Sequence, residues 1–323
     1  MESQVGADLC FPQLLNMSCR KPTSRSKMVL LNVLVSSVSL LTVSLNLLVI
    51  ISVSHFRQLH TPTNILLLSL AVSDFLVGLL VLPGEILRKS SCWFLGDVMC
   101  SLYKYVASLT ISASIGNMVL ISAERFVAIC DPLHYPTRVS APRVRFCVFL
   151  CWLCSLLYSG VFLKTDITEP DTPKSCFGQC IFITDYIIET IDLVVNFIFP
   201  IAVIVVLYLR VFAVAVSQAR SIRSHAKTVP LQRSVTVLVK KSELKAARTL
   251  GVLVAVFLIC FCPYYCVVLA GGSVSYVIYL FYFNSCLNPV IYALFYSWFR
   301  RAIKLTVTCK ILQPGSCDTN ILH

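Results

Sequence analysis

Seven long runs of apolar residues divide this chain, and they constrain its fold more than any other feature. The runs occupy residues 28–54, 63–87, 98–123, 144–163, 186–217, 248–270 and 274–296. Each is close to or above the roughly 20 residues that an α-helix needs to cross the apolar core of a bilayer. Only 13% of the 323 residues are charged, against about 25% in ordinary soluble proteins. The sequence therefore predicts an all-α membrane protein, a bundle of seven transmembrane helices.

The distribution of Lys and Arg predicts the orientation of the bundle. About two thirds of the 27 basic residues lie in the segments 55–62, 124–145, 210–248 and 300–310. Because basic residues in short loops favour the cytoplasmic side, these segments are expected inside and the N-terminus outside. The net charge of +12 then mostly reflects a basic cytoplasmic surface that faces anionic lipid or an acidic partner. Nucleic acid is not expected as a partner, since no soluble domain organises these residues.

Three parts of the chain follow from this topology. Residues 1–27 are expected to form an extracellular tail without a cleavable apolar segment, and residues 28–297 the seven-helix membrane domain. Residues 298–323 are expected to form a short cytoplasmic amphipathic eighth helix and a tail. Asn16 begins a glycosylation sequon in the outer tail. Cys309 and Cys317 follow the amphipathic stretch and are candidates for palmitoylation.

Six of the 16 cysteines fall on the oxidising outer side of the predicted topology. They are Cys10, Cys19, Cys92, Cys100, Cys176 and Cys180. An even set of six can close three disulfides in fifteen different ways, so spacing alone leaves their pairing open.

Asp192 lies within the fifth apolar run, where a carboxylate has no compatible partner in its own helix. An acidic side chain at the middle of a membrane helix costs roughly 2.5–3.5 kcal/mol on insertion. Such a residue usually faces a protein-lined cavity, and an anionic cavity selects cations. The alternative is a carboxylate neutralised within the bundle or reaching the headgroups. We take the functional role as the stronger prediction.

Further polar residues interrupt other membrane helices: Asn46, Asp74, Ser114, Asn284 and Asn288. Asn284 and Asn288 are four residues apart and share a helix face. A carboxylate, a hydroxyl and amides that converge offer oxygen ligands for sodium. Helix-joining hydrogen bonds, worth about 0.6 kcal/mol per pair, explain the same residues equally well.

Prolines inside three membrane helices, together with charged residues at the cytoplasmic end, indicate a hinged bundle with two states. Pro200, Pro263 and Pro289 each remove a hydrogen-bond donor from a membrane helix and favour a kink there. Glu243 and Arg125 are placed to form an ion pair between the sixth and third helices. Snorkelling of either side chain to the headgroups is the alternative.

Several motifs in this order resemble the rhodopsin-like G-protein-coupled receptors. They are Asn46 in Ser-Leu-Asn-Leu-Leu-Val, Leu-Ala-Val-Ser-Asp74, Glu124-Arg125-Phe126, Trp152, Pro200, Cys260-Phe-Cys-Pro263 and Asn288-Pro289-Val-Ile-Tyr292. Two longer segments resemble the trace amine-associated receptors, which are mostly vertebrate olfactory receptors for volatile amines. They are His55-Phe-Arg-Gln-Leu-His-Thr-Pro-Thr-Asn64 and the segment from Asn284 to Phe299.

This resemblance implies disulfides between Cys100 and Cys180, Cys10 and Cys176, and Cys19 and Cys92. It also implies an activation switch and a coupling surface for a heterotrimeric G protein, of the stimulatory olfactory type that raises cyclic AMP. The residues implied are Glu124, Arg125, Tyr208, Glu243, Asn288, Pro289 and Tyr292, with Ile115, Pro200 and Phe257 packed beside them. No phosphate loop, zinc spacing or nucleophile with its base is present, so no enzyme and no cofactor beyond the allosteric sodium ion are expected.

The sequence departs from the amine-receptor pattern where the ammonium partner should lie. Most amine receptors carry an aspartate seven residues after the third-helix cysteine, and Ala107 occupies that position here. Asp192 lies about 12 Å along the helix from Pro200, near the expected depth of Ala107 on the opposite wall. A group of fish trace amine-associated receptors lacks the third-helix aspartate and carries one on the fifth helix, and this chain resembles that group. Asp192 is therefore predicted to bind the ammonium.

The remaining predicted ligand residues surround Asp192. They are Glu189, Ala107, Ser108, Ile111, Phe261, Tyr264, Tyr265 and Tyr282. The aromatic rings are expected to supply cation–π contacts of about 0.5–2 kcal/mol each, with ordinary packing as the alternative. Glu189 or Glu85 could bind the far end of a diamine or polyamine, although a solvated carboxylate is the simpler expectation for each. A receptor for a non-amine ligand, with Asp192 structural, and a membrane transporter are the other hypotheses.

Overall fold

The computed structural model describes most of the chain but leaves gaps in the outer tail, the second outer loop and the third inner loop. Its described residues are 9–13, 18–19, 25–90, 92–168, 176, 178–180, 186–225, 233–272, 274, 276–313 and 315–318. Asn16 of the predicted glycosylation sequon lies outside them.

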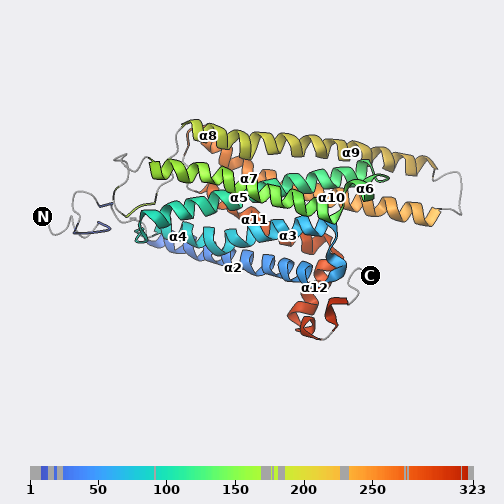
Figure 1. Cartoon of the computed structure of the whole chain (residues 1–323), viewed down its shortest axis with the longest axis horizontal. Helices are drawn as coiled ribbons and strands as arrows, with labels where there is room; N and C mark the ends of the chain where they lie inside the picture. Colours follow the sequence, from blue (N-terminus) through green and yellow to red (C-terminus); the bar gives the residue numbers. More distant parts are fainter. Residues whose placement is uncertain are drawn as a thin grey trace.

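Long helices running side by side make up the molecule, and they confirm the predicted seven-helix bundle (Figure 1). Five of the seven membrane helices are continuous α-helices: α2 (Arg25–His55), α5 (Gly96–Cys130), α7 (Ala141–Thr168), α10 (Arg233–Leu269) and α11 (Val277–Phe295). Pro263 lies inside α10, the sixth membrane helix, and Pro289 lies inside α11, the seventh. The short α6 (Tyr135–Arg138) lies between α5 and α7 in the chain.

The second and fifth membrane helices each contain one wide π turn. The second consists of α3 (Pro62–Leu76), the π turn Val77–Val81 and α4 (Leu82–Ser90). The fifth consists of α8 (Tyr186–Leu193), the π turn Val194–Ile198 and α9 (Phe199–His225). Such turns insert an extra residue into the helix and often occur at functional sites. The turn in the fifth helix lies between Asp192 and Pro200, the second residue of α9.

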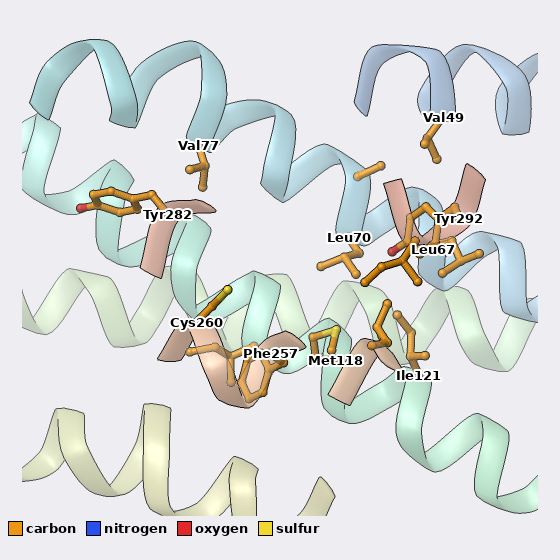
Figure 2. Packing of buried hydrophobic residues seen from close by; sticks show 14 of the residues in the cluster. Val49, Leu67, Leu70, Val77, Met118, Ile121, Phe257, Cys260, Tyr282 and Tyr292 are labelled. Carbon is orange, nitrogen blue, oxygen red and sulfur yellow. The ribbon is translucent and has the colours of Figure 1, made fainter. Parts of the chain in front are cut away.

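Buried side chains from several helices meet along the centre of the bundle. Figure 2 shows Leu70 of α3, Met118 and Ile121 of α5 and Tyr292 of α11 directed toward one another. Outward-facing residues are apolar as well; Leu40 and Phe199, for example, are 70% and 63% exposed. A water-soluble protein does not present so many apolar side chains, whereas lipid covers them at no cost.

The amphipathic eighth helix is present as α12 (Ser297–Val307). It follows α11 after one extended residue, Tyr296. Trp298, Phe299 and Ala302 are buried, whereas Arg300 and Arg301 are exposed. This separation of apolar and basic faces suits a helix lying along the inner membrane surface.

The outer disulfides correct the predicted pairing. Cys100 is bonded to Cys180 as expected, but Cys10 is bonded to Cys92 and Cys19 to Cys176. The predicted bonds Cys10–Cys176 and Cys19–Cys92 are therefore wrong, and the two tail cysteines exchange their partners.

Close packing of the outer segments explains this exchange. The amide of Cys10 donates to the carbonyl of Cys19 over 2.7 Å, which places the two tail cysteines side by side. The amide of Trp93 donates to the carbonyl of Gly178 over 2.9 Å and joins the first two outer loops. A Cβ on Gly178, which has a φ of +103°, would lie 2.8 Å from the Cβ of Cys10. The four half-cystines thus share one region, and sequence order does not decide between their pairings.

Candidate functional site

Asp192 lies in the last turn of α8, half-buried, and accepts hydrogen bonds from three different segments. The hydroxyl of Tyr158 on α7 donates to Oδ1 over 2.8 Å. The amide of Asn196, in the π turn, donates to the same oxygen over 2.8 Å. The hydroxyl of Tyr265 on α10 lies 3.4 Å from Oδ2. The carboxylate therefore faces the protein interior between three membrane helices.

Aromatic rings extend from this carboxylate into the core. Tyr265 stacks on Phe197, with ring centroids 4.4 Å apart. Tyr264 contacts Tyr265 edge-on at 5.1 Å and Phe281 at 5.0 Å. Phe281 contacts Phe261 at 4.2 Å. Of the predicted lining residues, the structure thus brings Tyr265 to Asp192 directly and places Tyr264 beside it, while Phe261 lies deeper.

The third-helix wall carries no acid at the expected position. Ala107 is 2% exposed, and its carbonyl accepts a hydrogen bond from the Thr110 hydroxyl over 3.1 Å. Ser108 accepts a hydrogen bond from Ser159 on α7 over 3.1 Å, and Ile111 is half-buried against the core. At these three positions the third helix offers no carboxylate for an ammonium.

Glu85 does not behave as the solvated carboxylate expected for it. Its side chain is fully buried, and it accepts bonds from Arg88 at 2.7 and 2.9 Å and from the Tyr103 hydroxyl at 2.8 Å. Lys89 adds an ion pair at 3.0 Å. Tyr282, also buried, lies beside this group rather than beside Asp192. Packing explains the burial, since the Tyr103 ring lies directly against Gly84, where a Cβ would approach to 2.5 Å.

Glu189 lies one turn outward from Asp192 and is exposed, in agreement with the simpler expectation for it. The two acids of the fifth helix therefore differ in environment. Asp192 is held by interior donors, whereas Glu189 is exposed.

A second buried polar group lies in the middle of the bundle, around Asp74. Asn288 donates to Oδ2 of Asp74 over 2.7 Å, and Ser114 donates to Oδ1 over 3.3 Å. Both side-chain polar atoms of Asn284 are buried with no protein partner. Asn46 donates to the carbonyl of Ser285 over 3.0 Å, which ties α2 to α11. One carboxylate with nearby hydroxyl and amide oxygens fits a hard cation such as sodium.

The cytoplasmic end of α5 carries a network around Glu124 and Arg125. Arg125 pairs with the Glu124 carboxylate at 2.5 Å and donates to the Thr63 hydroxyl. Tyr135 of α6 donates to Glu124 over 2.5 Å. Burial and this hydrogen bond raise the pKa of Tyr135 to about 12, so its hydroxyl stays a donor. The side chain of Glu243 lies outside the described residues, so its predicted latch to Arg125 stays a prediction.

Most of the other residues of the predicted switch are buried in the bundle. Ile115, Phe257, Pro289 and Tyr292 have little or no exposure, and Pro200 is buried as well. The Tyr208 hydroxyl lies against Gly251 of α10, where a Cβ would approach to 2.2 Å. Any side chain larger than hydrogen at 251 would displace Tyr208, so α9 and α10 are in direct contact there.

Sequence reasoning missed four residues of the Asp192 and Glu124 networks: Tyr158, Asn196, Thr63 and Tyr135. Asn196 follows Asp192 by four residues, a spacing that puts both on one helix face, so it was detectable. Tyr158, Thr63 and Tyr135 lie 34, 61 and 11 residues from their carboxylate partners, and no local pattern connects them.

Comparison with known proteins gives a consistent result over nearly the whole chain. The family model described as 7 transmembrane receptor (rhodopsin family) matches residues 45–292. The mouse trace amine-associated receptor 7e is 37% identical over 336 aligned residues, covering 99% of this chain and 93% of the mouse protein. The zebrafish trace amine-associated receptor 13c is 36% identical, covering 98% of this chain and 96% of the zebrafish protein.

Proposed function

Because the chain belongs to the rhodopsin-like seven-transmembrane receptors and, among them, to the trace amine-associated receptors, we propose that it senses a protonated volatile amine through Asp192. It is a multi-pass plasma-membrane receptor with an extracellular N-terminus, and it is not an enzyme. Its partners are a small-molecule ligand and a heterotrimeric G protein. The proposal concerns which ligand it binds, through which residues, and which signal follows.

The environment of Asp192 supports the amine assignment. A carboxylate within a membrane helix is tolerated where it faces the protein interior, and Asp192 is held there by Tyr158, Asn196 and Tyr265. An ammonium beside it gains a charge-assisted hydrogen bond, and the ring of Tyr265 adds a cation–π contact of about 0.5–2 kcal/mol. Ala107 leaves the opposite wall without a competing acid.

We further propose that one ammonium, rather than two, is recognised. Glu85 is occupied by Arg88, Lys89 and Tyr103, so a second ammonium would have to displace two protein cations. Such a displacement is unfavourable because the cations would lose their buried carboxylate. The engagement of Glu85 supports a monoamine and opposes a diamine or polyamine.

A ligand panel tests the proposed function. Cells that carry the receptor and a cyclic AMP reporter are exposed to primary monoamines, diamines, aldehydes, steroids and peptides. We expect responses to monoamines, through a stimulatory G protein of the olfactory type. A response to aldehydes or steroids with none to amines would favour the alternative, a non-amine receptor in which Asp192 is structural. Flux of solute in receptor-containing liposomes would favour a transporter instead.

Placing a second acid at residue 107 is expected to create a diamine response. Ala107→Asp adds a carboxylate on the third-helix wall, opposite Asp192, so that each end of a diamine gains its own partner. The half-effective concentration of a diamine should fall at least about tenfold, which corresponds to about 1.4 kcal/mol. Ala107→Asn has the same size without the charge and is the matched control. An equal diamine response in both variants would contradict the two-wall geometry.

We propose that activation opens the Glu124–Arg125 network and exposes Arg125 to the G protein. The supporting observation is that Arg125 is held by Glu124 and Thr63 while Tyr135 holds Glu124. Asn288, Pro289, Tyr292, Tyr208 and the cluster of Ile115, Pro200 and Phe257 are proposed to transmit the change. Glu243 is proposed to pair with Arg125 across the helices.

Glu124→Gln is expected to raise basal signalling. The change removes the charge that holds Arg125, and hydrogen bonds to charged groups contribute about 1.5–3 kcal/mol. Part of that energy stabilises the inactive form, so basal cyclic AMP should rise several-fold at equal surface expression. Tyr135→Phe, which removes only one donor to Glu124, should produce a smaller rise. Basal signalling at the wild-type level in Glu124→Gln would contradict the restraining role.

Three further assignments are proposals. Asp74, Ser114, Asn284 and Asn288 are proposed to hold an allosteric sodium ion, supported by the unpartnered buried amide of Asn284. Asn16 is proposed to carry a glycan. The chain is proposed to divide into a tail of residues 1–27, a receptor domain of residues 28–297, and the amphipathic helix with the cytoplasmic tail over residues 298–323.

A further inference from the structure

The two oxygens of the Asp192 carboxylate differ in their surroundings. Oδ1 accepts two short hydrogen bonds of 2.8 Å, one from Tyr158 and one from Asn196. Among the described residues Oδ2 has a single donor, Tyr265, at 3.4 Å, which is beyond the usual range for a hydroxyl donor. A carboxylate oxygen accommodates about two strong hydrogen bonds. Oδ1 is therefore saturated by the protein, and Oδ2 retains capacity for another donor.

Both donors to Oδ1 are held by surrounding structure. Tyr158 belongs to α7 and comes from outside the fifth helix, one residue before Ser159, which is bound to Ser108 of α5. Asn196 is 5% exposed within the π turn, and that turn directs its amide back onto Asp192. The χ2 torsion of an aspartate is broad, so a free carboxylate would take many orientations. Two fixed donors on one oxygen select a single orientation.

We infer that Tyr158 and Asn196 are positioning residues that hold Oδ1 of Asp192 and so present Oδ2, beside Tyr265, as the oxygen for the ligand. This inference rests on the proposed amine function and deepens it. The ligand must then offer an N–H to Oδ2. An ammonium with N–H donors satisfies that requirement, and a quaternary ammonium does not. The site is selective for primary ammonium ions over trimethylammonium ions of the same chain length.

The selectivity has a clear physical origin. A primary ammonium gains both the Coulomb attraction and a directed, charge-assisted hydrogen bond, and the directed part requires an oriented acceptor. A trimethylammonium gains the Coulomb attraction and the cation–π contact with Tyr265, and neither depends on the orientation of the carboxylate. Removing a hydrogen bond to Oδ1 therefore weakens the binding of the primary amine and leaves the binding of the quaternary amine nearly unchanged.

Tyr158→Phe tests the inference because it removes the hydroxyl and keeps the ring. A primary amine and its N,N,N-trimethyl analogue are measured on the intact receptor, the first by cyclic AMP response and both by competition binding. The half-effective concentration of the primary amine should rise about tenfold, since it depends on the orienting hydrogen bonds. Binding of the trimethyl analogue should change less than about threefold. Asn196→Ala, which removes the other donor, should give the same pattern.

Tyr186→Phe is the matched control, because Tyr186 begins α8, the helix that carries Asp192, and is 83% exposed. It should leave the binding of both probes unaltered. An equal loss for both probes in Tyr158→Phe and Asn196→Ala would overturn the inference, as would equal affinity of the two probes for the wild type. In either case a response lost in Asp192→Asn would leave the proposed amine function standing. A wild type silent to all amines would overturn both. If one variant fails to reach the surface, the other decides the outcome.

Discussion

Asp192→Asn is expected to reduce amine potency by roughly two orders of magnitude while the receptor still reaches the cell surface. Removing one partner of a buried, hydrogen-bonded charge pair costs about 2–5 kcal/mol, or between about 30-fold and several thousand-fold in affinity. The amide keeps an oxygen that can accept from Tyr158 and Asn196, so the contacts among α7, α8 and the π turn persist. The substitution therefore lowers the affinity for the ligand and leaves the fold intact. The measurement is a dose–response curve normalised to surface expression.

A matched control separates this effect from a general loss of negative charge at the outer side. Asp97 is exposed in the first turn of α5, and Asp97→Asn should leave amine potency within about threefold of the wild type, because exposed charges are screened. An unchanged amine response in Asp192→Asn would contradict the assignment of Asp192 as the ammonium partner.

Features that follow from local periodicity were predictable from the sequence. The seven membrane helices were predicted because a run of about 20 apolar residues has few ways to satisfy its backbone in lipid other than as a helix. The short helix α12 was predicted from its basic amphipathic pattern. Asp192 was identified because its charge is costly there. Each of these inferences depends only on residues close in the chain.

Features that depend on tertiary approach were not predictable. The burial of Glu85 requires the Tyr103 ring to fit against Gly84, and the sequence instead favoured a solvated carboxylate. The pairing of Cys10 with Cys92 depends on which outer segments meet, and the resemblance gave the wrong partner. The hydrogen bond from Tyr158 to Asp192 joins two helices across 34 residues. In each case a competing arrangement is equally compatible with the local sequence.

Glu85→Ala is expected to have the largest effect on stability. Glu85 is fully buried and neutralises Arg88 and Lys89, whose side chains are only 18% and 23% exposed. Removing one partner of a buried ion pair costs about 3–5 kcal/mol, and the partial exposure of the two cations favours the lower end of that range. Arg88 also donates to the carbonyl of Cys180 at 3.4 Å, so the loss extends to the second outer loop. Thermal unfolding in detergent and the surface-expressed fraction should both fall.

Removing the cations together with the acid distinguishes an unpaired charge from lost packing. Replacing a complete buried ion pair with uncharged groups often leaves stability nearly unchanged. The triple variant Glu85→Gln, Arg88→Gln and Lys89→Met should therefore recover most of the stability that Glu85→Ala loses. Glu189→Gln serves as the control for acid removal, because Glu189 is exposed and its replacement should change stability by less than about 1 kcal/mol. If the triple variant unfolds as readily as Glu85→Ala, the loss comes from packing around Tyr103 and not from charge. The same triple variant gives a diamine no new acid, so its half-effective concentration for a diamine should stay at the wild-type value, whereas that of Ala107→Asp should fall.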